Sequence, residues 1–256
     1  MDGLIAALPG QHEHFTKSAV TPKAAGSWHS LWTTAGQPGA GAAQGSVNGA
    51  VPTSATAGAF VFTNPVSANS YLGKFSAASS TTGTLILYDR LWHNSGLSAT
   101  VTTSQAITQP ALTRPDALSG DVELWAEIYT ATTAAATATA TYTDQDGNTG
   151  NSATASIIAA SVVGQMFPFN LAAGDTGVRA VTAVQLSGSM TAGNWGLTLL
   201  RRVAEIPIGL AGVGNTYDTI ALGMPRIYDS ACLAMMLMAT GTTFGPVTGG
   251  IDIIQG

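Results

Sequence analysis

The sequence predicts an all-β protein, an antiparallel β-sandwich or jelly roll with an extended N-terminal arm. Three observations support this fold class. Short runs rich in β-formers recur at irregular spacing, about nine in all. No long run has the periodicity of an amphipathic helix. A segment rich in Gly, Ala, Ser and Thr precedes the first strong β signal. We therefore divide the chain into an arm over residues 1–59 and a sandwich domain over residues 60–256.

The arm has too few large side chains to build a core of its own. Residues 2–8 suit a short helix that ends at Pro9-Gly10, and residues 33–59 contain no charge. Apolar anchors flank that stretch: Trp28, Leu31 and Trp32 before it, and Phe60, Val61 and Phe62 after it. Ordering one backbone residue costs roughly 1–2 kcal/mol. We therefore expect the arm to become ordered only in an assembly, where it crosses onto a neighbouring subunit.

The expected strands follow one another from Tyr71 onward. Residues 122–129 alternate most clearly, with Val122, Leu124, Ala126 and Ile128 on one face and Glu123, Trp125, Glu127 and Tyr129 on the other. The other expected strands are 71–77, 84–92, 137–143, 153–157, 178–187, 195–203, 232–239 and 251–254. Residues 204–229 hold several Gly and Pro residues, so we expect a long connection there with one helical turn near residues 217–222.

The segment 144–150 is expected to be a hairpin turn, because it contains an Asp-Gly pair and a second Gly. Its Asp144-x-Asp146-x-Asn148 spacing also resembles the start of a calcium loop. Such a loop requires Gly at its sixth position and Glu at its twelfth. Thr149 and Ala155 stand at those positions, so the turn is the better interpretation.

Charged residues are scarce in this chain. They make up 9% of it, against roughly 25% in an ordinary soluble domain. The net charge is -5, and the 9 Lys and Arg residues are scattered, with one adjacent pair at Arg201-Arg202. Phosphate binding needs clustered cations, so direct binding of nucleic acid is not expected. The low charge favours a surface that is buried against protein partners over a free one.

Other features bear on the compartment. Cys232 is the single cysteine, so no intrachain disulfide can form, and its apolar surroundings predict an inert buried thiol. The first residues lack the basic region of a secretory signal. The apolar run 231–239 is shorter than the ~18 residues that a membrane helix needs. We expect a protein made in the cytoplasm and not inserted in a membrane.

Signatures of catalysis are absent from the sequence. There is no Gly-x-Ser-x-Gly, dinucleotide-binding or phosphate-loop motif. His12 and His14 would share a strand face while Glu13 points away, which predicts a solvated polar patch rather than a metal site. Glu123 and Glu127 would lie about 13 Å apart along a strand, too far for a glycosidase pair. We expect no enzyme activity, no catalytic residue, no cofactor and no metal.

Two strand faces could bind something other than protein. Thr137, Thr139, Thr141 and Thr143 form one row of hydroxyls, whereas an ice-binding surface needs several rows, so an ordinary exposed face is expected. Trp125 shares a face with two glutamates, which predicts exposure and allows sugar stacking, although aromatic residues are also enriched in interfaces. The residues that we expect to contact other subunits are Trp28, Leu31, Trp32, Phe60, Phe62 and Trp125.

Several segments resemble virion structural proteins of tailed bacteriophages. They are Leu85-Ile86-Leu87-Tyr88-Asp89-Arg90-Leu91, Gly96-Leu97-Ser98-Ala99-Thr100-Val101-Thr102, Gly174-Asp175-Thr176-Gly177-Val178-Arg179, Leu199-Leu200-Arg201-Arg202 and Pro225-Arg226-Ile227-Tyr228-Asp229. The resemblance covers the chain from about Trp28 to the last residue. It rests on these short segments and not on a defined binding motif. It implies a component of the particle that is assembled in the host bacterial cytoplasm.

Within that class, the sequence lacks the long spine helix of a major capsid protein and the heptads of a tail fibre. A compact β domain with an apolar arm favours a head decoration, or cement, protein. Such a protein would bind the major capsid protein or other virion proteins, and a homo-oligomer is the default. The alternatives are a receptor- or glycan-binding module of the tail or baseplate, and a β-sandwich hydrolase whose site only the fold would assemble.

Overall fold

The computed structural model describes residues 10–114 and 120–256, and it confirms the all-β, antiparallel fold class. The expected helix at residues 2–8 lies outside the described residues. The one helix among the described residues is α2 (Thr219–Leu222), in the region where a helical turn was expected. Asp218 caps its first turn by accepting hydrogen bonds from the N–H groups of Ile220 and Ala221, and Gly223 ends it with φ 67°.

The chain forms two compact units, each with its own core. Within the described residues, unit 1 comprises 10–42, 53–89 and 202–256, and unit 2 comprises 43–52, 90–114 and 120–201. Two long strands contribute to both units: β5 (Gly83–His93) and β13 (Asn194–Ile208). These units do not coincide with the expected division into residues 1–59 and 60–256.

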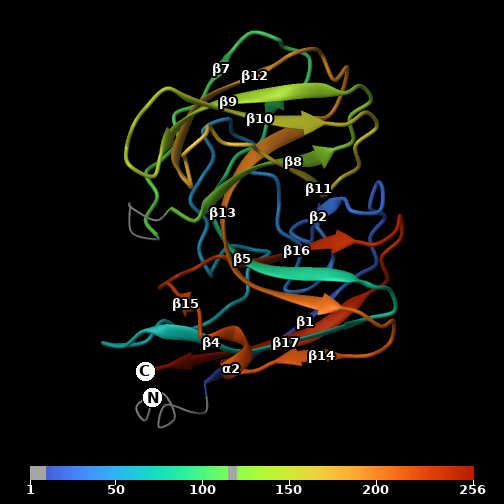
Figure 1. The fold of residues 1–256 in the computed structure, drawn as a ribbon, viewed down its shortest axis with the longest axis vertical. Coiled ribbons are helices and arrows are strands. Elements are labelled where there is room, and N and C mark those ends of the chain that lie inside the picture. Colours follow the sequence, from blue (N-terminus) through green and yellow to red (C-terminus); the bar gives the residue numbers. More distant parts are fainter. Residues whose placement is uncertain (1–9, 115–119) are drawn as a thin grey trace. The chain divides into compact units, whose positions relative to one another are not determined.

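Unit 1 contains a six-stranded antiparallel sheet (Figure 1). Its main path runs β14-β4-β17-β1-β3, and β15 also pairs with β4. The strands are β1 (Gln11–Lys17), β3 (Gly36–Gln37), β4 (Ser70–Ser79), β14 (Asn215–Tyr217), β15 (Arg226–Ile227) and β17 (Val247–Gln255). A second layer of the same unit pairs β16 (Leu233–Ala239) with β5 and with β2 (Trp28–Ser30).

The core of unit 1 is made of large apolar side chains from both layers. Phe15, Phe75 and Ile251 of the six-stranded sheet cluster with Leu87 and Met235 of the second layer. The aromatic rings of Phe15 and Phe75 lie 6.4 Å apart between centroids. Runs of β-forming residues, rather than strict alternation, located β4 and β16 in the sequence, and β16 is buried over almost its whole length.

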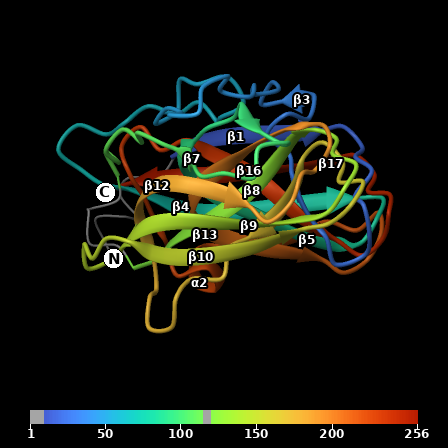
Figure 2. The same cartoon turned by 90° about the horizontal axis from the view of Figure 1, so that it is seen from above.

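Unit 2 contains a four-stranded sheet in the order β10-β9-β12-β7. Its strands β9, β10 and β12 lie side by side in Figure 2. They are β7 (Gln105–Ala106), β9 (Ala136–Asp144), β10 (Asn151–Ile157) and β12 (Val178–Leu186). The facing layer pairs β8 (Val122–Thr130) with β11 (Gln165–Pro168) and β13, and β13 with β6 (Leu97–Ser98).

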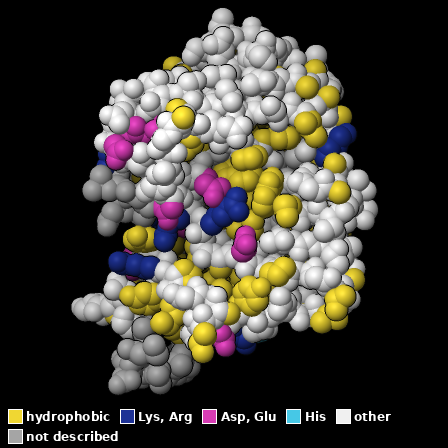
Figure 3. Space-filling model, in the orientation of Figure 1, with side chains coloured by type: hydrophobic (Ala, Val, Ile, Leu, Met, Phe, Trp, Pro, Cys, Tyr) yellow, Lys and Arg dark blue, Asp and Glu magenta, His cyan; other side chains and the backbone are white. Residues whose placement is uncertain are grey.

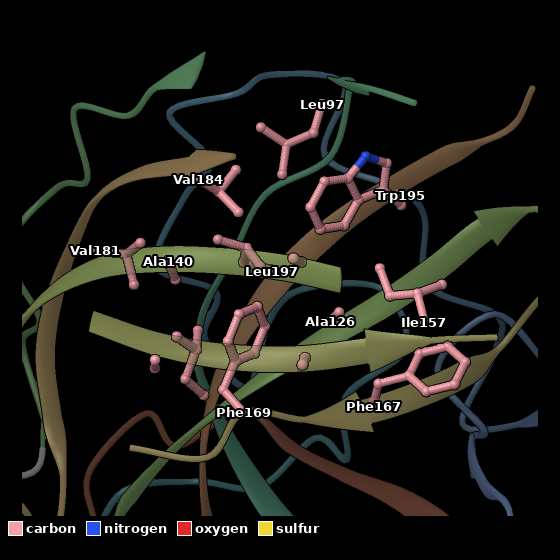
Figure 4. Close-up of a cluster of buried hydrophobic side chains, with 14 of the residues drawn as sticks. Leu97, Ala126, Ala140, Ile157, Phe167, Phe169, Val181, Val184, Trp195 and Leu197 are labelled. Atoms are coloured by element: carbon pink, nitrogen blue, oxygen red, sulfur yellow. The ribbon is translucent and has the colours of Figure 1, made fainter. Parts of the chain in front are cut away.

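Small residues dominate the contribution of strands β9 and β10 to the core of unit 2. Ala138 and Ala140 of β9 and Ala153 and Ala155 of β10 are buried. The facing layer and the loops fill the space with larger groups, including Trp195, Leu197, Phe167 and Phe169 (Figure 4). Each unit is therefore a two-layered antiparallel β-sandwich with a single apolar core.

Residues 10–59 belong to these sandwiches in the single chain. Strand β1 pairs with β17 over seven residues, from Gln11 opposite Ile253 to Lys17 opposite Val247. Lys17 is buried, and its Nζ donates to the backbone oxygens of Thr34 and Pro38 at 3.1 and 2.7 Å. This differs from the expectation of an arm that becomes ordered only in an assembly. The sequence did not reveal this pairing because the partner of β1 lies at residues 247–255, and no local pattern links the two segments.

Candidate interaction surface

The residues that we expected to contact other subunits are covered by the chain itself. Leu31, Trp32 and Phe60 are each 1% exposed, and Phe62 is also buried. Trp32 donates from Nε1 to the oxygen of Ala42 at 3.0 Å. Trp28 is half-buried, and the guanidinium of Arg202 lies 5.2 Å from the centre of its ring.

Trp125 was expected to be exposed, and this expectation is wrong. The side chain is 1% exposed, and its Nε1 donates to Glu123 Oε2 at 2.8 Å. Alternation placed it correctly on the opposite face from Leu124 and Ala126, but both faces of β8 are covered. The role of all six residues in subunit contacts stays a prediction, and in this conformation the five buried ones anchor their own chain.

Three strongly exposed apolar side chains lie at the two ends of an edge strand of unit 1. We name Leu210, Val213 and Ile220 the edge patch; they are 68%, 54% and 90% exposed. They follow β13 and flank β14, which is the edge strand next to β4. The N–H of Gly212 donates to the oxygen of Ser79 on β4 at 2.7 Å, which fixes the turn against the sheet.

The stretch of sequence that carries the edge patch holds a single charge. Asp218 is the one charged residue between Gly209 and Gly223, and its carboxylate accepts the hydrogen bonds that begin α2. Exposed apolar side chains with few charges among them are typical of a surface that contacts another protein. Sequence reasoning missed the patch because residues 204–229 looked like a connection.

A hydroxyl-rich face covers the outside of the four-stranded sheet of unit 2. Thr137, Thr139 and Thr141 of β9 lie opposite Ser156, Thr154 and Ser152 of β10. The structure therefore adds a second row to the single row seen in the sequence. On the side of the molecule shown in Figure 3, charged side chains form only a few small groups and most of the surface is uncharged.

Unit 2 also contains a buried ionic cluster. The guanidinium of Arg90 donates from Nη2 to both carboxylate oxygens of Glu127, at 2.9 and 2.7 Å. Tyr129 and Thr198 donate their hydroxyl protons to Glu127 Oε2 at 3.0 and 2.8 Å. Arg90 Nη1 lies 3.0 Å from Nδ1 of His93. Arg90 and Glu127 are each 0% exposed.

The electrostatics of this cluster hold each group in one protonation state. Burial and the charge of Arg90 lower the pKa of His93 to about 3, against the opposing effect of Glu127. The ring is therefore neutral, and its Nδ1 accepts a hydrogen bond from Arg90. Burial and the charge of Glu127 raise the pKa of Tyr129 well above its ordinary value. Because these groups are sealed from solvent, the cluster organises the interior and offers no place for a substrate.

The Asp144 turn uses its carboxylate to hold its own loop. Asp144 Oδ1 accepts the N–H groups of Asp146 and Asn148 at 2.9 and 2.8 Å, and Oδ2 accepts Asn148 Nδ2 at 2.8 Å. Burial raises the pKa of Asp144, but the hydrogen bonds from Asn148, Asp146 and Gly147 outweigh it and lower the pKa overall. This geometry confirms the turn.

Two further findings concern the described part of the chain. No group of three or more His, Cys, Asp or Glu side chains within residues 10–114 and 120–256 is placed to hold a metal ion. In the same residues, no helix has the length and apolarity that a membrane crossing requires.

Comparison with known proteins identifies no family. No protein-family model matches this sequence, and no curated protein matches it. Among solved structures, a match is found to the structure of infectious bursal disease virus, Gt strain, with a TM-score of 0.22 and 9% identity over 96% of this chain and 81% of that one. A second is to the VP2 subviral particle of the same virus, with a TM-score of 0.19 and 11% identity over 97% of this chain and 81% of that one. At these TM-scores, the backbones do not superimpose as one fold.

Proposed function

We propose that this chain is a structural subunit of a bacteriophage particle, and that it stabilises the head as a decoration protein bound across capsid subunits. The observation that carries the proposal is the chemistry of the surface. Only 9% of the residues are charged, and the edge patch exposes large apolar side chains in a stretch of sequence that holds a single charge. Interface cores are depleted in charge in the same way.

The resemblance to virion proteins of tailed bacteriophages supports the same class. The mechanism is mass action, because a protein that binds only the assembled lattice stabilises that lattice. The partner would be the major capsid protein or a neighbouring virion protein, together with further copies of this chain. Two hydrogen-bonded antiparallel sandwiches suit such a structural role.

The test is co-sedimentation of the purified chain with DNA-free heads of the phage that encodes it. We expect saturable binding and heads that withstand higher temperature. A double variant with Leu210→Asp and Ile220→Asp should bind roughly tenfold or more weakly, because it places charge in the contact. Val163→Asp is the matched control, since Val163 is 46% exposed in unit 2.

The outcomes separate the parts of the proposal. Absence of binding to heads would contradict the decoration role, and binding to purified tails would move the chain to another part of the particle. Equal binding by the double variant and the control would exclude the edge patch as the contact.

The alternative of a glycan-binding module was based on exposed tryptophans. All five tryptophans lie in described residues. Four of them are at most 1% exposed, and the fifth, Trp28, is half-buried beneath Arg202. We therefore do not propose glycan binding.

A further inference from the structure

Two histidines face each other on the exposed side of the six-stranded sheet of unit 1. His12 and His14 lie two residues apart on β1, and both are exposed. Their Nε2 atoms are 3.1 Å apart, and the rings meet edge to face with centroids 4.2 Å apart. His29 and His93, the other two histidines of the chain, are buried.

A carboxylate fixes the orientation of the first ring. Asp252 lies directly opposite His12 in the pairing of β17 with β1, and its Oδ1 bonds to Nδ1 of His12. A carboxylate accepts, so Nδ1 of His12 carries the proton, and in the neutral ring Nε2 then presents its lone pair toward His14. In metal sites, a carboxylate behind a histidine sets the tautomer and raises the basicity of the ligand in this manner.

The distance between the two nitrogens suits a shared metal ion. Imidazole nitrogens bind Zn²⁺ at about 2.0–2.1 Å, and a tetrahedral angle between them places the nitrogens about 3.3–3.4 Å apart. The observed 3.1 Å requires a movement of a few tenths of an ångström. Imidazole ligands suit Zn²⁺, Cu²⁺ and Ni²⁺. We infer that His12 and His14 chelate one divalent transition-metal ion through their Nε2 atoms, with Asp252 as the positioning residue.

A glycine of the neighbouring strand leaves space beside the two histidine rings. Gly250 lies opposite His14, and a Cβ atom there would come within 3.1 Å of Cε1 and 3.3 Å of Nε2 of His12. The missing side chain leaves room for the ring and for solvent at the remaining coordination positions. When the metal binds, His14 gives up its Nε2 proton, which leaves to solvent or moves to Nδ1. The inference replaces the expected solvated polar patch with a two-histidine site.

The experiment is calorimetric titration of the full, untagged chain with ZnCl₂. We expect one equivalent to bind. His12→Asn and His14→Asn should each weaken the affinity at least tenfold, and Asp252→Asn should weaken it about 10–100-fold, as loss of an orienting carboxylate does. Thr16→Ala is the matched control, because Thr16 is exposed on the same strand and should leave binding unchanged.

Imidazole ¹⁵N spectra give a second readout that depends on the atoms rather than on the heat. Zn²⁺ should shift the Nε2 signals of both His12 and His14 and leave Nδ1 of His12 protonated. Absence of one-equivalent binding by the wild-type chain would overturn the inference. Unchanged binding by a double variant with His12→Asn and His14→Asn would overturn it as well, and circular dichroism of each variant checks that the fold is intact.

Discussion

Units 1 and 2 are both two-layered sandwiches, but they fill the space between the layers with different side chains. Unit 1 fills the space between its layers with large side chains such as Phe15, Phe75 and Met235. Unit 2 brings two alanine-lined strands, exemplified by Ala140 of β9 and Ala153 of β10, against larger groups. Unit 2 also buries a complete ionic cluster, whereas unit 1 buries the ammonium of Lys17 among backbone oxygens. The comparison teaches that one fold class tolerates either kind of interior, with different weaknesses.

The largest expected effect comes from deletion of residues 1–59. This removes β1, the second strand from one edge of the unit 1 sheet, and leaves β17 without a seven-residue partner. We expect loss of the cooperative thermal transition of unit 1 in scanning calorimetry, because each unpaired buried backbone group is costly. If the truncated chain keeps this transition, residues 1–59 do not stabilise unit 1, and the expectation of an arm that acts only in an assembly is supported.

The next effect concerns the ionic cluster that distinguishes unit 2. Glu127→Ala leaves the guanidinium of Arg90 buried without its carboxylate and should lower the free energy of unfolding by about 3–5 kcal/mol. Asp121→Ala is the control, since it breaks the 2.7 Å contact with Arg201 where Asp121 is 52% exposed and should cost at most about 1 kcal/mol. Urea denaturation measures both, and equal costs would mean that the buried cluster is dispensable.

A smaller effect tests the alanine-lined strands. Ala140→Leu adds three carbon atoms to a fully buried position of β9 and should destabilise the protein by about 1–3 kcal/mol through overpacking. Thr139→Val, one residue earlier and on the outer face, should change the stability by no more than about 0.5 kcal/mol. If the two variants have the same midpoint of urea unfolding, the small side chain at position 140 is not required.

The smallest effect is a change of stability with pH in unit 1. Burial lowers the pKa of Lys17 from 10.5 to about 8. Between these values the unfolded chain binds more protons at this site than the folded chain, so stability rises with pH through that window. Urea titrations from pH 7 to 10 should show the wild type gaining stability relative to Lys17→Met. Parallel curves for the two proteins would mean that the ammonium is not desolvated.

The sequence predicted the longer strands because their own residues carry the signal. Alternation over 122–129 located β8, and the Asp-Gly pair located the turn between β9 and β10. It did not predict β1, whose polar residues His12, Glu13 and His14 look like a solvated segment until β17 pairs with them. Strands of two or three residues, such as β6 and β15, are too short to show any period.

The same limit applies to the candidate surfaces. Alternation tells which residues share a face, but not what covers that face. Trp125 and Glu127 were placed on the correct side of β8, yet Glu127 is buried because Arg90, 37 residues earlier, supplies its counter-charge. The edge patch was missed for the opposite reason. Leu210 and Ile220 carry no pattern, and their exposure follows from the pairing of β14 with β4.

The pairing of β1 with β17 also sets an order of events during synthesis. Every described residue of unit 2 precedes residue 202, so the unit has been translated while the unit 1 sheet still lacks β17, the middle strand of its main path. Residues 11–17 must wait for residues 247–255 before their ladder can close. Contacts so far apart in sequence form slowly, and domains fold as units as the chain emerges. The unit 1 sheet is therefore completed only after residues 247–255 have been made, when the residues of unit 2 have already been synthesised.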